Sequence, residues 1–210
     1  MKKKQSQIIL SKYSPLMAVD AELFTQDGNK LPTPRVFSLC RCGASNNKPF
    51  CDGMHATIRF SGERKPNKAL HKKPQEYKGS KVTVHDKRAL CCHHGTCNLI
   101  GVFTHEKPWI KPDNAERTED VVEIVKKCPT GALTATIDNK EIKNWFEQQK
   151  IIIQKNGPYY IQGGVKLIDD QATDTVLVTE DHYALCRCGA SNIKPLCDGT
   201  HTSINFKDEK

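Results

Sequence analysis

This sequence has no long apolar run. No stretch reaches the roughly 18 to 20 apolar residues needed to span a bilayer. The first residues, MKKKQSQIILSKYSPLM, are basic but lack the apolar core of a secretory signal. Hydrophobic residues make up 37% of the 210, which is lean for one large core. We therefore expect a soluble, cytoplasmic protein without membrane contact, whose small units need stabilisation besides apolar burial.

The motifs of common enzyme classes are also missing. There is no Gly-rich dinucleotide loop, no Walker sequence and no Gly-x-Ser-x-Gly elbow. Once the cysteine motifs described below are assigned, no segment is left for a substrate domain. We expect that the chain is not an independent enzyme, and a role as a subunit of an oxidoreductase system stays open.

Acidic residues are fewer than basic ones, 24 against 32, so the net charge is +8. Residues 61–81 hold seven Lys or Arg against two Glu, and so contribute a net five of these charges. Their Pro and Gly content predicts a solvated linker. Because no recognition helix or RNA-binding aromatic pattern accompanies it, nucleic acid is not the expected partner. A basic linker favours an acidic redox partner protein.

Cysteine is abundant, with ten residues, and in the cytoplasm free thiols are more often metal ligands or redox groups than crosslinks. LCRCGASNNKPFCDGMH at 39–55 returns almost unchanged as LCRCGASNIKPLCDGTH at 185–201. Cysteines two apart project to one side of an extended segment, and a Cys and a His four apart share one face of a helical turn. The candidate ligands are Cys40, Cys42, Cys51 and His55, then Cys186, Cys188, Cys197 and His201.

The repeat extends upstream of the cysteines. QIILSKYSPLMAVDAELFTQDG from Gln7 aligns with KIIIQKNGPYYIQGGVKLIDDQ from Lys150, and each reads as strand, Pro turn and strand. We predict a β-rich α+β fold in which the two halves form an intramolecular pseudo-twofold pair. The expected units are a first half at 1–62, a basic linker at 63–79, an inserted domain at 80–142 and a second half at 146–210.

Residue chemistry alone leaves two kinds of metal open. Three Cys and one His suit tetrahedral zinc, but Cys-x-Cys followed by Cys-Asp-Gly-x-His does not match the common zinc spacings. Two pairs of ligands also suit two irons bridged by sulfide. Both interpretations stand at this point.

The pattern Cys-x-Cys-x2-Ser-x3-Pro-x-Cys-Asp-Gly-x-His resembles the CDGSH, or NEET, iron–sulfur family. The resemblance implies a [2Fe–2S] cluster at each motif, with Cys40 and Cys42 on the inner iron and Cys51 with His55 on the outer one. The second motif repeats this with Cys186 and Cys188, then Cys197 and His201. Thr200 before the His fits the family, whereas Met54 departs from it. The duplication resembles the single-chain pseudodimers of the family, so a monomer is expected.

A single His ligand has two physical consequences. It removes one negative charge from a cluster relative to Cys, which raises the reduction potential. Its ligating nitrogen must also stay deprotonated, so acid competes with iron. We predict that both clusters become labile as the pH falls toward or below about 6.5.

The inserted region has its own cysteine pattern, in ALCCHHGTCNLIGVF and VEIVKKCPTGAL. Cys91, Cys97 and Cys128 occupy three ligand positions of a ferredoxin half, and His94 stands where the fourth is expected. EDVVEIVKK predicts a short amphipathic helix that leads into Cys128. The region resembles the divergent single-cluster ferredoxin-like domain, which implies a [3Fe–4S] or [4Fe–4S] cluster. His93, Cys92 and an external group remain alternative fourth ligands.

Together these motifs predict an electron-transfer protein with three iron–sulfur centres. A second hypothesis is cluster storage or transfer, or redox and pH sensing, through the weaker outer His ligand. A third is a structural zinc protein that binds nucleic acid through the basic linker, which predicts a colourless protein with salt-sensitive binding.

Overall fold

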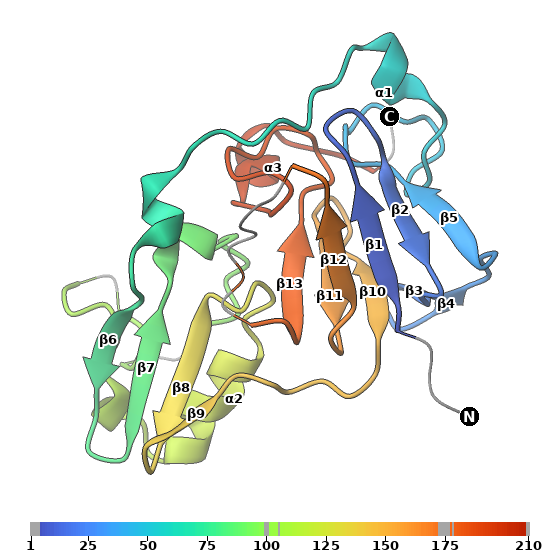
Figure 1. The fold of residues 1–210 in the computed structure, drawn as a ribbon. Coiled ribbons are helices and arrows are strands. Elements are labelled where there is room, and N and C mark those ends of the chain that lie inside the picture. Colours follow the sequence, from blue (N-terminus) through green and yellow to red (C-terminus); the bar gives the residue numbers. More distant parts are fainter. Residues whose placement is uncertain (1–4, 99–100, 105, 172–176, 178, 209–210) are drawn as a thin grey trace.

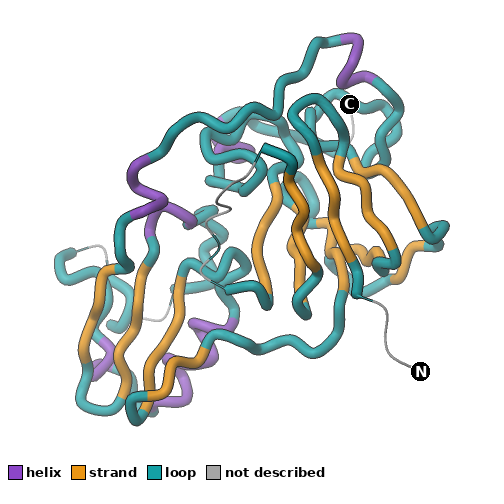
Figure 2. Tube along the Cα trace, viewed as in Figure 1, coloured by secondary structure: helices purple, strands orange, loops and turns teal. Residues whose placement is uncertain are grey.

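The computed structural model describes residues 5–98, 101–104, 106–171, 177 and 179–208. Strands and loops dominate, and helices are few and short (Figure 2). Among the described residues, no helix is long and apolar enough to cross a membrane. The β-rich fold predicted from the sequence is confirmed.

The two ends of the chain repeat the same order of elements (Figure 1). Each begins with a strand, a Pro turn and a second strand, as the alternating apolar residues predicted. The first half contains β1 (Gln7–Leu10), β2 (Leu16–Val19), β3 (Leu23–Thr25), β4 (Lys30–Leu31), β5 (Val36–Leu39) and α1 (Met54–Thr57). The second half contains β10 (Lys150–Ile153), β11 (Tyr159–Gln162), β12 (Lys166–Asp169), β13 (His182–Leu185) and α3 (Thr200–Ser203).

The third strand of each half lies in the sheet of the other half. One sheet has the order β12-β1-β2-β5 and the other β13-β11-β10-β3-β4. β12 pairs in parallel with β1, and β3 pairs in parallel with β10, with Leu23 opposite Ile151. Separating the halves would therefore break a backbone ladder in both sheets, and would leave edges that expose unpaired N–H and C=O groups.

Buried and less buried side chains alternate along strands of the two halves, and the buried ones meet in a shared core. In β1, Ile8 and Leu10 are buried while their neighbours Gln7 and Ile9 are less so. Such a period of two is what a strand with one covered face requires. A single cluster of buried residues continues from both sheets into the inserted domain.

The inserted domain is an antiparallel sheet with one helix. The sheet has the order β6 (Gln75–Lys78), β7 (Val82–Asp86), β8 (Leu133–Ile137) and β9 (Lys140–Ile142). α2 (Thr118–Lys126) contacts β8 and buries Val121 and Val125, one turn apart. The short 3₁₀ helices are η1 (Lys68–His71), η2 (Arg88–Leu90) and η3 (Pro112–Asn114). The helix predicted before Cys128 is confirmed.

The basic linker is shorter than predicted. Its last part, Gln75–Lys78, forms β6 and pairs with β7. Only Tyr77 of this strand is buried. A single apolar residue among polar ones shows no alternation, so the sequence did not predict β6. The inserted domain therefore begins near residue 75 rather than 80.

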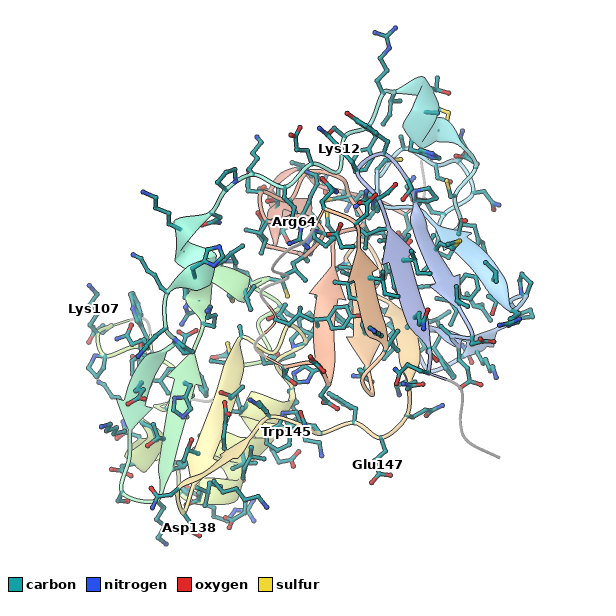
Figure 3. All side chains as sticks on the ribbon, in the orientation of Figure 1. Lys12, Arg64, Lys107, Asp138, Trp145 and Glu147 are labelled. Carbon is teal, nitrogen blue, oxygen red and sulfur yellow. The ribbon has the colours of Figure 1, made fainter. Side chains whose placement is uncertain are left out.

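The inserted domain is attached to the second half. Trp145 lies in the segment that leads from β9 to β10 (Figure 3). The backbone N–H groups of Trp145 and Phe146 donate to the carboxylate of Asp181 at 2.9 and 3.3 Å. A Cβ added at Gly131 would lie 2.5 Å from the side chain of Thr179, so the loop after Cys128 packs closely against the segment before β13.

Candidate metal centres

Backbone hydrogen bonds fold each cysteine loop onto the strand before it. In the first loop (residues 40–51), the amide of Cys40 donates to Pro49 O at 2.8 Å and that of Cys51 to Ser38 O at 2.9 Å. The hydroxyl of Ser45 donates to Phe50 O at 2.7 Å. The second loop (residues 186–197) repeats all three bonds, with Ser191 in the place of Ser45. Both serines are therefore turn residues that hold the loop closed.

An aspartate orders the turn that follows each loop. The carboxylate of Asp52 accepts from the amides of Asn46 and Met54 at 2.8 and 3.1 Å, and these bonds lower its pKa. Asp198 accepts in the same way from Asn192 and Thr200. This Asp therefore satisfies backbone amides on both sides of the turn. The helical turn is shorter than predicted, because α1 begins at Met54 and leaves Cys51 outside it.

Each motif brings its ligands together as two pairs. The sulfurs of Cys40 and Cys42 lie 3.7 Å apart, and those of Cys186 and Cys188 lie 3.8 Å apart. A Cys sulfur and a His Nδ1 form the other pair, at 3.2 Å in the first motif and 3.4 Å in the second.

These distances match the spacing of two ligands on one tetrahedral metal. Two sulfurs bound at about 2.3 Å lie about 3.7 Å apart, and a sulfur and a nitrogen about 3.5 Å apart. Within the described residues, no three or more His, Cys, Asp or Glu side chains converge on one metal ion. Two separate pairs per motif fit two bridged irons, and the protein residues present therefore suit a [2Fe–2S] cluster.

The thiols within each Cys-x-Cys pair share a proton. A hydrogen bond from Cys42 lowers the pKa of Cys40, and one from Cys186 lowers the pKa of Cys188. Each pair thus favours one thiolate, which is the form that binds metal. Burial raises the pKa of Cys197 to about 12, so loading the second site would release its proton.

The Arg between the two cysteines of each pair is buried. The Nε of Arg41 donates to Ser14 O at 2.8 Å, and Nη1 of Arg187 donates to Gln154 O at 2.8 Å. Each guanidinium thereby ties its loop to the Pro turn between the first two strands of its own half. Sequence reasoning missed this role, although the repeat keeps Arg at both positions.

The two cysteine loops also pack against each other. A Cβ added at Gly43 would lie 2.4 Å from Cys188 O, and one at Gly189 would lie 2.5 Å from Cys42 O. The hydroxyl of Tyr159, from the second half, donates to Cys40 O and Pro49 O at 2.9 Å each. The first loop is therefore held partly by residues of the second half.

Tyr159→Phe is expected to affect the first motif selectively. The buried hydroxyl is lost and two loop carbonyls lose a donor, which costs about 1–2 kcal/mol of unfolding free energy. The equivalent residue of the first half is Leu16, so the second loop has no such bond. Tyr183→Phe is the control, since its hydroxyl donates to Val165 O at 2.7 Å outside the loops. Chemical denaturation should show both losses, while the visible spectrum should change only in Tyr159→Phe.

The third group of cysteines surrounds a cavity of about 180 Å³. Cys91, Cys97 and Cys128 line it, so the structure brings together the three ligands predicted for the inserted domain. Burial and the neighbouring thiols Cys91 and Cys128 raise the pKa of Cys97. Three thiols that line one cavity, rather than converging on a single ion, suit a cluster with thiolate ligands.

The candidates for the fourth ligand lie at the edge of this cavity toward the second half. His94 lines the cavity, and its ring also packs edge-on against Tyr160 at 5.4 Å between centroids. Cys92 lines the cavity too, but it is 3% exposed and packs with Tyr160, Ala184 and Cys197. His94 as fourth ligand stays a prediction.

Comparison with known proteins decides between the two kinds of metal. Residues 14–56 and 156–202 match the family described as iron-binding zinc finger, CDGSH type. Residues 77–138 match the family described as divergent 4Fe-4S mono-cluster. The chain is an iron–sulfur protein with two CDGSH domains. CDGSH domains bind [2Fe–2S] clusters, and the domain between them is of a [4Fe–4S] type.

A curated relative agrees with this identification. The chain is 32% identical over 62 residues to the CDGSH iron-sulfur domain-containing protein NEET of Arabidopsis thaliana. The match covers 28% of this chain and 57% of the plant protein, so the chain spans little more than half the length of that relative. No solved structure matches the chain significantly.

Proposed function

We propose that this CDGSH protein transfers electrons and holds three iron–sulfur centres. Two would be [2Fe–2S] clusters with three Cys and one His ligand each, at the two motifs. The third, at Cys91, Cys97 and Cys128, would be a [4Fe–4S] cluster if His94 or another group is the fourth ligand, and a [3Fe–4S] cluster otherwise. In this proposal the chain is a redox carrier rather than an enzyme.

The contact between the inserted domain and the second motif carries the proposal. A Cβ added at Gly199 would lie 2.8 Å from Cys92 O and 3.2 Å from His93 Cδ2. Gly199 stands between Cys197 and His201, and Cys92 follows Cys91. The ligands of two centres are therefore adjacent, which an electron carrier needs and a pair of independent storage sites does not.

The surrounding residues would give the centres different potentials. A neutral His ligand raises the potential relative to four thiolates. The buried guanidinium of Arg41 places positive charge near the Cys-x-Cys pairs, which favours the reduced, more negative cluster, whereas the charge of Arg187 is offset by its ion pair with Asp208. In the inserted domain, Arg88 also lines the cavity, but it is more exposed and its charge is offset by an ion pair with the buried Asp86. We expect the CDGSH clusters to be reduced first.

The further features of the proposal concern assembly and partner. The exchange of β3 and β12 supports an intramolecular pseudo-twofold pair that is complete as a monomer. The sheet and helix around Cys128 support a ferredoxin-like inserted domain.

Exposed Lys65, Lys72 and Lys73 in the basic linker favour an acidic redox partner over nucleic acid. We place the protein in the cytoplasm, without membrane contact.

A reductive titration tests electron transfer. Protein purified without oxygen should be bleached stepwise by dithionite and should recover its full visible spectrum when a mild oxidant is added. Iron and sulfide measured afterwards should be unchanged. Loss of iron on the first reduction would contradict a carrier function.

Cluster storage or transfer is the second candidate function, because the outer pair of the first motif is partly exposed. Cys51 and His55 are half-buried, and Asp52 and Gly53 between them are exposed. Transfer of one cluster per chain to an apo-ferredoxin, without loss of iron to solution, would favour this function over electron transfer.

Acid is expected to release the [2Fe–2S] clusters as the pH falls from about 6.5 toward about 5, because protonation of the His ligand competes with iron in this range. The aspartates of the turns are not the cause: the pKa of Asp52 and of Asp198 lies below the ordinary value of 3.8, so their contribution to stability is lost only at lower pH. Visible spectra recorded at neutral pH and through this acid range measure the loss of the clusters. A spectrum that stays unchanged for hours at about pH 5 would contradict this prediction.

A further inference from the structure

The two CDGSH motifs differ in what covers their outer ligands. The turn glycines Gly53 and Gly199 have the same backbone, with φ of +90° and +85°. A Cβ added at Gly53 would meet nothing within 4 Å, whereas one at Gly199 would meet Cys92 and His93. This difference cannot be read from the motifs themselves, because both turns have the pattern Cys-Asp-Gly-x-His.

Residues 92–94 cover the second motif from the inserted domain. Cys92 packs against Cys197, Ala184 and Tyr160 in one buried cluster, and Cys197 is 3% exposed. The ring of His94 lies edge-on against Tyr160, at an interplanar angle of 89°. His201 faces a cavity of about 300 Å³ whose lining includes His93, His94 and Tyr160.

The first motif is open at the corresponding place. Cys51 is half-buried where Cys197 is buried, and Asp52 and Gly53 are exposed where Asp198 and Gly199 are half-buried. In Figure 1, α1 lies at an outer end of the molecule, while α3 lies between the sheets and the inserted domain.

We infer that residues 92–94 seal the second CDGSH site, so that the two sites have different tasks. The first is the site that exchanges with solvent and with partners. The second is an internal site, retained next to the inserted domain. This inference rests on the proposed function, because it requires that both motifs hold clusters.

Release to an iron chelator measures the difference in the full-length protein. A strong Fe²⁺ chelator is added with a mild reductant, and the [2Fe–2S] absorbance is followed with time. We expect two phases of equal amplitude, with the slow phase at least about tenfold slower, which corresponds to about 1.4 kcal/mol of additional opening free energy. A single phase for both clusters would overturn the inference.

Ligand variants assign the phases to the motifs. His55→Cys and His201→Cys keep a ligand that iron–sulfur clusters accept and change the spectrum of one cluster each. The spectrum of the fast phase should change in His55→Cys and that of the slow phase in His201→Cys. The opposite assignment would overturn the inference.

Gly199→Ala and Gly53→Ala form a matched pair that tests the role of residues 92–94. Both add a methyl group at a positive φ and so have similar backbone strain, but only the methyl group of Gly199→Ala meets Cys92 O. Gly199→Ala should accelerate the slow phase toward the fast one, and Gly53→Ala should leave the slow phase unchanged. Equal effects of both variants on the slow phase would overturn the inference.

Tyr160→Leu provides a second route in case Gly199→Ala does not fold. It removes the ring that packs against His94 and replaces no predicted ligand, and it should also accelerate the slow phase. A slow phase unchanged in Tyr160→Leu and in Gly199→Ala would overturn the inference. Protein that contains no iron and sulfide after anaerobic purification would instead refute the proposed function itself, so the two failures are distinguishable.

Discussion

Cys51→Ala is expected to remove two irons and two sulfides per chain and to destabilise the whole protein. Iron–sulfur ligation is coupled to folding, since the site is not preformed in the unfolded chain. No residue of α1, the turn that carries His55, is buried. We expect a loss of about 3 kcal/mol or more, a decrease in Tm of at least about 6 °C.

Met54→Thr is the matched control for this variant. It changes a neighbour of Cys51 to the residue that the second motif has at the equivalent position, Thr200. Iron content and Tm should stay close to those of the wild type. If Cys51→Ala lost its cluster but kept full thermal stability, the claim that metal stabilises the ends of the chain would be wrong.

Gly43→Ala should destabilise the protein by about 3–5 kcal/mol, from the left-handed backbone and a steric clash together. The φ of Gly43 is +79°, and the added methyl would lie 2.4 Å from the backbone oxygen of Cys188. Because the clashing atom belongs to the backbone of the second cysteine loop, it cannot rotate away. Both loops would have to move, so we expect both [2Fe–2S] clusters to be lost together.

Gly28→Ala separates backbone strain from the contact between the loops. Gly28 has a φ of +85°, and a Cβ there would meet nothing within 4 Å. This variant should cost only about 1–2 kcal/mol and should keep its iron. Thermal unfolding and iron analysis of both variants measure the difference. Equal stability and equal iron content in Gly43→Ala and Gly28→Ala would show that the two loops do not support each other.

The local features of this fold could be predicted from the sequence. The first two strands of each half follow from their alternating apolar residues, and α2 follows from Val121 and Val125 on one face. The pairing of Cys40 with Cys42 follows from their spacing. These features depend on residues that are close together in the chain. For such residues, the spacing of apolar side chains and of cysteines is sufficient to predict the local structure.

The relations between distant segments could not be predicted. β3 has only three residues, too few for a period that would place it in the sheet of the other half. The cover that residues 92–94 provide for Gly199 depends on how the inserted domain sits against the second half. Arg41 and Arg187 resemble surface charges in the sequence until their partners, backbone carbonyls of the Pro turns, are in place.

The most direct test of the account is the metal content of protein purified without oxygen. Iron, zinc and sulfide should be quantified on the sample used for visible and electron paramagnetic resonance spectra. We predict about seven to eight irons per chain, little zinc, and signals from two kinds of cluster. A colourless protein with zinc and no sulfide would contradict the iron–sulfur account and leave only the fold.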